Sequence, residues 1–215
     1  MLELNNINIF EYPISTYPFR ESIIELIGED ELELLHRKFD FFLLEREKDQ
    51  STKFHKDFYA KYAGSTFEKL YEKFIQDFIQ GLLETKVINQ AKPTFRVHMN
   101  DNLGVGEFHK DSDYDHPIEE INLLIPVTKA SETSTIWIES QPGLKDYAPV
   151  NLDYGQCLVF KGSKLEHGNK INRTGKTRVS FDFRVIPEAD YKPSQGGSIN
   201  TGLKFELGQY YKKLK

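Results

Sequence analysis

The chain has 215 residues and a formal net charge of -5, and without a basic stripe it lacks the electrostatic footprint of a nucleic-acid-binding protein. No apolar stretch approaches the roughly 18 residues of a membrane span, and no signal-peptide pattern opens the chain. We therefore expect a cytoplasmic protein that partners neither nucleic acid nor a membrane, and the composition leaves its oligomeric state open.

Helical spacing dominates residues 1–92. Ser65 and Glu68 have the spacing of a capping box, and apolar side chains recur at three- and four-residue intervals from Phe67 to Leu83. A similar stripe over residues 30–47 predicts a second helix. Because both stripes are one-sided, these helices must lie against another layer of structure.

From Pro93 onward the period of the pattern changes to two, which predicts strands with one apolar and one polar face. The strands are expected over residues 94–100, 120–125, 155–160 and 178–185. The single cysteine, Cys157, lies in one of them and is interpreted as an inert core thiol, because cysteine is among the most buried residue types. Turn-rich breaks between short strands favour a sandwich or barrel.

We expect one domain over residues 1–215, with a mainly helical part (1–92), a β core (93–187) and a polar tail (188–215) that wraps the surface. The polar strand faces have two explanations. They either face water, or they line a pocket while the apolar faces pack on the helices. The second is favoured because the helices need an apolar sheet face to cover.

His109-Lys110-Asp111 is the first part of a candidate metal site. On a strand, residues two apart point the same way, so this imidazole and this carboxylate would aim at one point. His167 follows 58 positions later (167 − 109 = 58), a gap that suits a third ligand from a later strand. Two imidazoles and one carboxylate suit Fe(II) and leave coordination positions open. His55-Lys56-Asp57 repeats the pattern, but on a helix residues two apart diverge by about 200°, so His55 is interpreted as structural.

Arg178 and Ser180 follow on one predicted strand face. The turn-rich segment 169–175 predicts a hairpin that would place His167 and Arg178 on adjacent antiparallel strands. The planar fork of arginine suits two-point capture of a carboxylate, and Ser180 can donate one more hydrogen bond to the same group. A carboxylate cosubstrate held there could reach back to the metal.

The ordered set His109-x-Asp111, His167, Arg178-x-Ser180 resembles the Fe(II)/2-oxoglutarate-dependent oxygenases. The wider segments 93–98, 106–114, 116–117 and 178–185 resemble the branch that contains streptomycin-biosynthesis-type oxygenases. The resemblance covers most of the chain after Pro93. It implies a mainly β fold with flanking helices, in which a double-stranded β-helix (jelly-roll, cupin-like) core packs against the N-terminal helices.

By that resemblance His109, Asp111 and His167 are the catalytic iron ligands, Arg178 and Ser180 hold the distal carboxylate of 2-oxoglutarate, and O₂ is consumed. The implied reaction hydroxylates a small polar metabolite, such as a sugar, aminocyclitol, amino acid or nucleotide-linked compound, with release of succinate and CO₂. Related halogenases replace the metal-binding carboxylate with a small residue, so Asp111 favours oxygenation over halogenation.

Further polar side chains are candidates for the same pocket, although each could instead be structural. Asn100 and Asn122 are placed with the cofactor-binding residues. The candidates for substrate contact are Arg96, His98, Asp113, Tyr114, Trp137 and Arg184. His116 is expected in a loop near the mouth of the site.

Two other functions stay open. A cupin-like metal protein, such as an isomerase or ligand-binding module, would need no 2-oxoglutarate, and the Arg178-x-Ser180 pair argues against it. A non-catalytic jelly-roll interaction protein would not need the complete ligand set. The sequence fixes neither the substrate nor whether the outcome is hydroxylation, desaturation or cyclisation.

Overall fold

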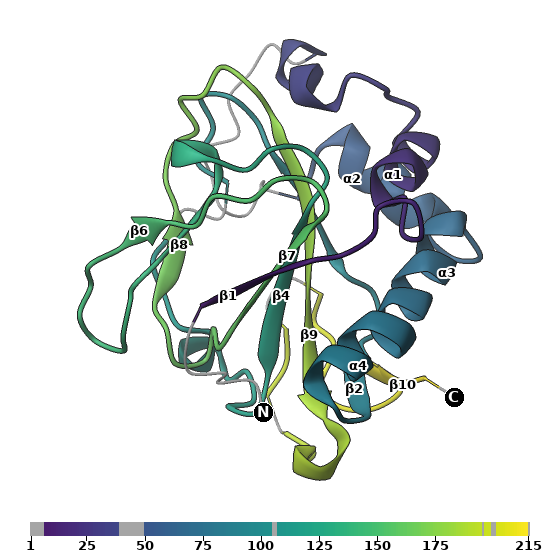
Figure 1. The fold of residues 1–215 in the computed structure, drawn as a ribbon, viewed down its shortest axis with the longest axis vertical. Coiled ribbons are helices and arrows are strands. Elements are labelled where there is room, and N and C mark those ends of the chain that lie inside the picture. Colours follow the sequence, from purple (N-terminus) through teal and green to yellow (C-terminus); the bar gives the residue numbers. More distant parts are fainter. Residues whose placement is uncertain (1–6, 39–49, 105–106, 195, 199–200, 215) are drawn as a thin grey trace.

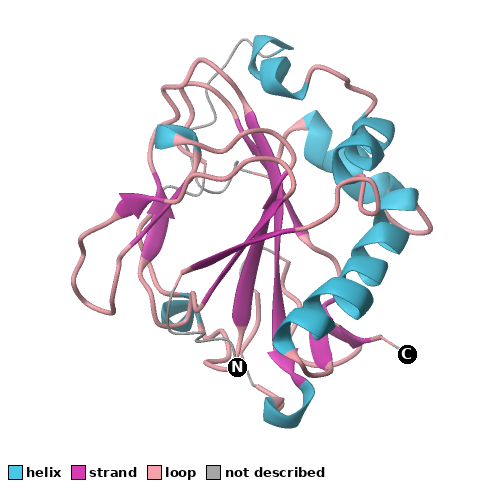
Figure 2. Cartoon of the chain, viewed as in Figure 1, coloured by secondary structure: helices cyan, strands magenta, loops and turns pink. Residues whose placement is uncertain are grey.

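The computed structural model describes residues 7–38, 50–104, 107–194, 196–198 and 201–214. Figure 1 shows three layers, with a small sheet on the left, a long sheet in the centre and a row of helices on the right. In Figure 2 the longer helices are gathered along one side of the strands, and a few short helical turns lie elsewhere. The predicted mainly β fold with flanking helices is confirmed.

The main sheet has seven strands in the described part of the chain, with the order β1-β7-β4-β9-β2-β10 and with β3 pairing β9 beside this path. All of its pairings are antiparallel. The strands are β1 (Asn8–Glu11), β2 (Val87–Gln90), β3 (Thr94–His98), β4 (Ile121–Pro126), β7 (Gln156–Phe160), β9 (Arg178–Pro187) and β10 (Tyr211–Lys213). Four of these were predicted: β3, β4 and β9 from the alternation of side chains, and β7 as a buried strand.

The helical layer consists of α1 (Phe19–Ile27), a 3₁₀ helix (Leu32–Lys38), α2 (Lys53–Lys61), and a run made of α3 (Thr66–Lys73), a π-helix (Phe74–Ile79) and α4 (Gln80–Leu83). The run confirms the helix predicted after Ser65, whose hydroxyl accepts the Glu68 N–H at 3.0 Å. The Glu68 carboxylate reaches back to the N–H of Gly64. Of the helix predicted over residues 30–47, residues 39–47 lie outside the described part of the chain.

The apolar face of the main sheet packs against these helices. Phe58 of α2 stacks on Phe95 of β3 with ring centroids 4.4 Å apart, and Phe67 of α3 meets Phe181 of β9 edge-on at 5.1 Å. All four rings are fully buried. The thiol of Cys157 is also buried in this core, and burial raises its pKa, as expected for an inert thiol. The polar faces of the same strands are left to face the small sheet.

The small sheet has the order β6-β5-β8, with β5 (Ile136–Ile138), β6 (Ala148–Pro149) and β8 (His167–Asn169). The predicted hairpin between His167 and Arg178 is therefore wrong, because His167 pairs with β5 whereas Arg178 begins β9 of the main sheet. The turn-rich segment between them crosses from one sheet to the other. Within this segment the N–H of Asn172 donates to the Asn102 carbonyl at 2.9 Å, and not to a neighbouring hairpin strand.

The tail does not simply wrap the surface as predicted. β10 adds to the main sheet beside β2, and Phe205 and Tyr211 are fully buried. Phe205 packs against Tyr210 and against His116, with ring centroids 4.9 and 4.2 Å apart. The tail therefore forms one end of the core.

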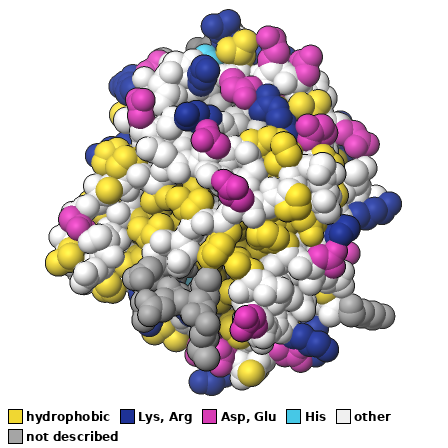
Figure 3. Space-filling model, viewed as in Figure 1, with side chains coloured by type: hydrophobic (Ala, Val, Ile, Leu, Met, Phe, Trp, Pro, Cys, Tyr) yellow, Lys and Arg dark blue, Asp and Glu magenta, His cyan; other side chains and the backbone are white. Residues whose placement is uncertain are grey.

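No helix in the described ranges has the length and apolarity needed to cross a bilayer. Figure 3 shows hydrophobic side chains in the middle of this face, between charged groups at its upper and lower ends. Ile9, in the edge strand β1, is one of the exposed apolar residues at 44%.

Candidate active site

The polar faces of β3, β4 and β9 line a cavity of about 570 Å³ between the two sheets. β9 alone contributes Arg178, Asp182 and Arg184, which share one strand face because they lie an even number of residues apart. Residues of β8 form the opposite wall. The predicted use of the polar strand faces, to line a pocket, is confirmed.

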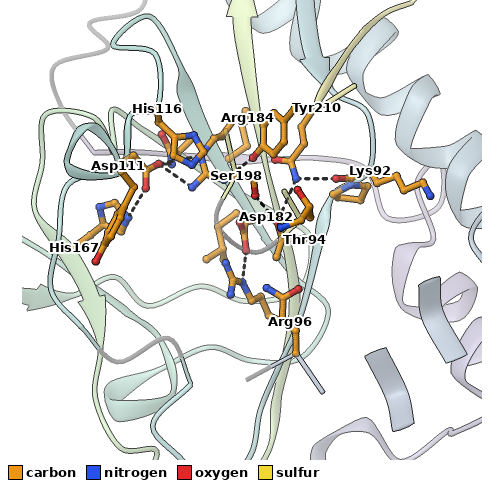
Figure 4. A pocket seen from close by; sticks show the side chains of 18 of the residues that line it. Lys92, Thr94, Arg96, Asp111, His116, His167, Asp182, Arg184, Ser198 and Tyr210 are labelled. Carbon is orange, nitrogen blue, oxygen red and sulfur yellow. Dashed lines mark hydrogen bonds and ion pairs between the residues drawn. The ribbon is translucent and has the colours of Figure 1, made fainter. Parts of the chain in front are cut away.

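His109, Asp111 and His167 meet at one wall of this cavity. The Nε2 atoms of His109 and His167 lie 3.6 and 3.7 Å from Oδ1 of Asp111, and the three candidate ligand atoms all lie within 4.8 Å of one another. One ion with metal–ligand distances of about 2.1 Å can reach all three. Figure 4 shows Asp111 and His167 facing each other at the left of the cavity.

His109 and Asp111 do not lie on one strand, as was predicted. His109 and His167 exchange backbone hydrogen bonds of 3.0 and 2.9 Å in an isolated bridge, and Asp111 begins a 3₁₀ helix (Asp111–Tyr114). The N–H of Asp111 donates to the carbonyl of Gly162 at 2.8 Å. A Cβ at Gly162 would lie 2.6 Å from the Asn122 side chain, so this close approach needs glycine.

Both imidazoles are held in the form that binds a metal. Nδ1 of His109 lies 2.8 Å from the Glu107 carbonyl, and Nδ1 of His167 lies 2.9 Å from the Leu165 carbonyl. Because a carbonyl only accepts, each Nδ1 carries the proton and each Nε2 keeps its lone pair. Burial lowers the pKa of His167, which also favours the neutral ring. This donor set fits a ferrous ion.

Asp111 is 1% exposed and is ionised. Burial alone would raise its pKa, but the Arg184 guanidinium and the neighbouring imidazoles hold the pKa of this carboxyl well below its usual range. Oδ2 accepts from the amide of Asn122 at 2.6 Å and from Nε of Arg184 at 3.0 Å. The side chain is thereby fixed by two residues that do not belong to the candidate ligand set.

Arg178 lies in the wall of the same cavity and is only 5% exposed. Its Nε donates to the Ser134 carbonyl at 3.0 Å, and Nη1 donates to the hydroxyl of Ser180. These contacts orient a guanidinium fork at the cavity, the arrangement that a carboxylate ligand needs. Ser180 itself is fully buried beneath Arg178 and is not part of the cavity wall.

Comparison with known proteins gives one close relative. The streptomycin biosynthesis protein StrG of Streptomyces griseus is 35% identical to the chain over 202 residues, which cover 93% of this chain and 94% of StrG. No family model matches the chain. At this identity and coverage, the chain belongs to the family of StrG.

Solved structures agree with this assignment at the level of the fold. SnoK, titled a non-haem α-ketoglutarate-dependent carbocyclase from nogalamycin biosynthesis, matches with a TM-score of 0.58 at 9% identity, over 99% of this chain and 93% of SnoK. EctD of S. alaskensis, solved with 2-oxoglutarate and 5-hydroxyectoine, matches with a TM-score of 0.56 at 10% identity, over 91% of this chain and 77% of EctD. The predicted jelly-roll core is confirmed.

Fe(II) and 2-oxoglutarate are the predicted metal and cosubstrate, and EctD, which shares the fold, was solved with 2-oxoglutarate. The described residues fit both groups by their chemistry. Neutral imidazoles and a carboxylate suit the iron, and a buried guanidinium suits the cosubstrate.

The other predicted site residues fall into two groups. Arg96, Tyr114, Asn122 and Arg184 line the cavity, whereas His98, Asn100, Asp113 and Trp137 do not. His98 is buried beside Arg178, with Nε2 2.8 Å from the Asn102 carbonyl. Burial lowers the pKa of His98 to about 3.

The remaining three residues of the second group make local contacts. Asn100 accepts from the N–H of Gly175 at 2.8 Å, and Asp113 accepts from the N–H of Lys110 at 2.9 Å. The indole of Trp137 donates to the Glu132 carbonyl at 3.0 Å. Each of these interactions holds a loop or turn outside the cavity wall.

Several cavity residues had no signal in the sequence. Glu120, fully buried, accepts from Nδ1 of His116 at 2.9 Å and lies 3.3 Å from Nε of Arg184. Tyr210 and Ser198 reach the cavity from the tail, as Figure 4 shows. The sequence signal that could have identified Glu120 is its position as a charged residue directly before the apolar run of β4. The irregular tail gave no such signal for Ser198 or Tyr210.

Proposed function

We propose that this chain hydroxylates a small polar metabolite, with Fe(II) held by His109, Asp111 and His167 and with 2-oxoglutarate held by Arg178. The observation that carries the proposal is the meeting of these side chains at one cavity. The three candidate ligand atoms lie within 4.8 Å of one another, and the buried Arg178 lies in the wall of the same cavity.

When bound, Fe(II) and 2-oxoglutarate supply the oxidising chemistry, in which one oxygen atom of O₂ enters succinate as CO₂ leaves and the other enters the substrate. His109 and His167 present their Nε2 lone pairs because backbone carbonyls hold the protons on Nδ1. Asp111 supplies one negative charge through Oδ1. Three protein ligands would leave coordination positions open for the cosubstrate and O₂.

Arg178 fixes the distal carboxylate of 2-oxoglutarate through its planar fork. Ser180 acts on Arg178, because its hydroxyl accepts from Nη1 beneath the cavity wall. Burial strengthens both contacts, since competing water is excluded from a guanidinium that is 5% exposed. Ser180 was predicted to donate to the cosubstrate carboxylate itself, and we propose instead that it supports this site by orienting Arg178.

A polar substrate is supported by the chemistry of the walls away from the metal ligands. Arg96 donates to Asp182 at 2.7 Å, and Thr94, Ser198 and Gln209 add uncharged hydrogen-bonding groups. Such walls suit a molecule that carries several hydroxyl or amino groups. The name of StrG, a streptomycin biosynthesis protein, favours a sugar or aminocyclitol among the four predicted substrate classes.

The experiment that tests the function measures succinate release from a library of polyols, aminocyclitols, amino acids and nucleotide sugars. We expect release that needs both iron and 2-oxoglutarate, with a product 16 mass units heavier than the substrate. A product two mass units lighter than the substrate would indicate desaturation or cyclisation instead of hydroxylation. No 2-oxoglutarate consumption with any substrate, despite tight metal binding, would favour the cupin-like alternative.

A further inference from the structure

The two oxygen atoms of the Asp111 carboxylate have different surroundings. Oδ1 is the atom nearest to both imidazoles, 3.6 Å from Nε2 of His109 and 3.7 Å from Nε2 of His167. Oδ2 accepts from the Asn122 amide at 2.6 Å, and it lies 3.0 Å from Nε and 2.9 Å from Nη2 of Arg184. Oδ2 is thus saturated by N–H donors, whereas Oδ1 faces the metal position.

Arg184 and Asn122 reach Oδ2 together because of the sheet register. The two residues are direct partners on the antiparallel strands β9 and β4, so their side chains lie side by side on the face toward the cavity. Asn122 is itself fixed, since its Oδ1 accepts the N–H of Gly162 at 3.1 Å. The carbonyl of Gly162 in turn accepts the N–H of Asp111, which closes the contacts around this ligand.

Arg184 is held by a second buried carboxylate. Nε lies 3.3 Å from Oε2 of Glu120, which is fully buried, and Nη1 donates to the hydroxyl of Tyr210 at 3.2 Å. The Arg184 side chain is only 12% exposed. Without this guanidinium the carboxylates of Asp111 and Glu120 would face each other in a low-dielectric site, which is unfavourable for both charges.

We propose that Arg184 and Asn122 are positioning residues that occupy Oδ2 of Asp111 and so restrict this ligand to one oxygen, with Glu120 and Tyr210 holding Arg184 in place. The inference rests on the proposed ligand set. By keeping Oδ2 off the metal, the two residues preserve the coordination positions that 2-oxoglutarate and O₂ need. They also make the C-terminal tail, through Tyr210, part of the support of the metal site.

The test measures the binding of Co(II), a stable substitute for Fe(II), to the full chain and to six variants. Arg184→Gln and Asn122→Ala remove the donors to Oδ2. We expect each to raise the dissociation constant of Co(II) about 10- to 100-fold, the usual effect of losing a partner of a metal ligand. We also expect the visible Co(II) spectrum to change, because the released Oδ2 can turn toward the ion.

Two matched controls separate positioning from general loosening of the fold. Arg20→Gln breaks another arginine–carboxylate fork, in which both contacts to Glu33 measure 2.9 Å, far from the metal site in the helical layer. Asn89→Ala removes another fully buried amide, on β2, which donates to the Gln90 carbonyl instead of to Asp111. We expect both controls to keep the dissociation constant within about twofold and to keep the spectrum.

Arg184→Lys serves as the conservative variant, because it keeps the charge but not the fork. We expect it to fold and to bind Co(II) with an affinity between those of the parent and Arg184→Gln. Variants that melt at lower temperature but keep both the affinity and the spectrum would overturn the inference. Equal losses of Co(II) affinity in the control variants would overturn the inference as well. Unchanged Co(II) binding in Asp111→Ala would instead defeat the proposed ligand set, which keeps the two failures distinct.

Discussion

Burial makes the charge of each residue in this site depend on its immediate partners. Backbone carbonyls hold the Nδ1 protons of His109 and His167, so Nε2 is the metal-facing nitrogen of each neutral ring, and Asp111 is kept charged by Arg184. Arg178 is a charged side chain in the wall opposite the apolar core, oriented by Ser134 and Ser180. The charges of Asp111 and Arg178 therefore suit a site that binds a divalent metal ion together with a dianionic cosubstrate.

Replacing Arg178 with Ala should weaken the binding of 2-oxoglutarate. Loss of one partner of a buried, hydrogen-bonded charge pair costs about 2–5 kcal/mol, which corresponds to at least about a thirtyfold rise in the dissociation constant. Isothermal titration of 2-oxoglutarate into the metal-loaded protein measures this constant. Unchanged 2-oxoglutarate affinity in Arg178→Ala would remove this residue from the cosubstrate site, while unchanged metal affinity is expected in the same variant.

The buried His55 should make stability depend on pH. Burial lowers the pKa of His55 to about 3, so between about pH 6.5 and pH 3 the unfolded chain binds a proton at this residue and the folded chain does not. This contribution to the free energy of unfolding is therefore lost as the pH falls, by up to about 1.4 kcal/mol per pH unit. His55→Leu should flatten the profile of urea denaturation between pH 6 and pH 4. A profile as steep as that of the parent would show that His55 does not titrate in this way.

At the scale of elements, the helices and the main sheet are joined by aromatic side chains on the apolar strand faces. The helix that begins at Thr66 is aligned on the sheet by its first turn, where Ser65 accepts the Glu68 N–H and Phe67 packs on Phe181. Phe181 lies on the apolar face of β9, so the polar face of this strand points away from the helix and toward the cavity.

Ser65→Ala should lower the free energy of unfolding by about 0.5–2 kcal/mol, because the first turn loses the acceptor for the Glu68 N–H. Thr66→Ala is the neighbouring control. Thr66 is exposed and does not cap the helix, so we expect a change within about 0.5 kcal/mol. Urea denaturation measures both, and equal effects of the two substitutions would exclude the capping role.

The sequence was sufficient for the elements whose pattern is local. β3, β4 and β9 follow from the alternation of apolar and polar side chains, β7 from its apolar run, and the helix after Ser65 from its spacing and cap. The pairing of β8 was missed because a turn-rich segment has the same composition whether it closes a hairpin or crosses between sheets. The approach of His109 to His167 was also missed, since an isolated bridge has no periodicity.

On the scale of the whole molecule, the candidate ligands were identified from the order of their motifs along the chain and not from a predicted geometry. His109, Asp111, His167 and Arg178 were named correctly as neighbours, but Glu120 and Tyr210 were not, because nothing local distinguishes a buried carboxylate in a network from one at the surface. Long-range pairing of β10 with β2 brings Tyr210 to the cavity, and such pairing leaves no pattern within the tail itself.

We propose that residues 1–215 unfold as one domain, since one hydrophobic cluster joins side chains of the helices and of the main sheet. The only tryptophan, Trp137, lies in β5 of the small sheet and reports on that layer, while far-ultraviolet circular dichroism reports chiefly on the helices. We expect the two signals to change over the same range of urea concentration. Separate transitions would indicate that the small sheet and the helical layer are independent units.

The central claim is that one cavity holds Fe(II) and 2-oxoglutarate together, and an anaerobic titration of both into the full chain tests it most directly. We predict a weak visible charge-transfer band that saturates at one equivalent of each and is lost in Asp111→Ala. A folded, iron-loaded protein that gives no such band at saturating 2-oxoglutarate would contradict the claim.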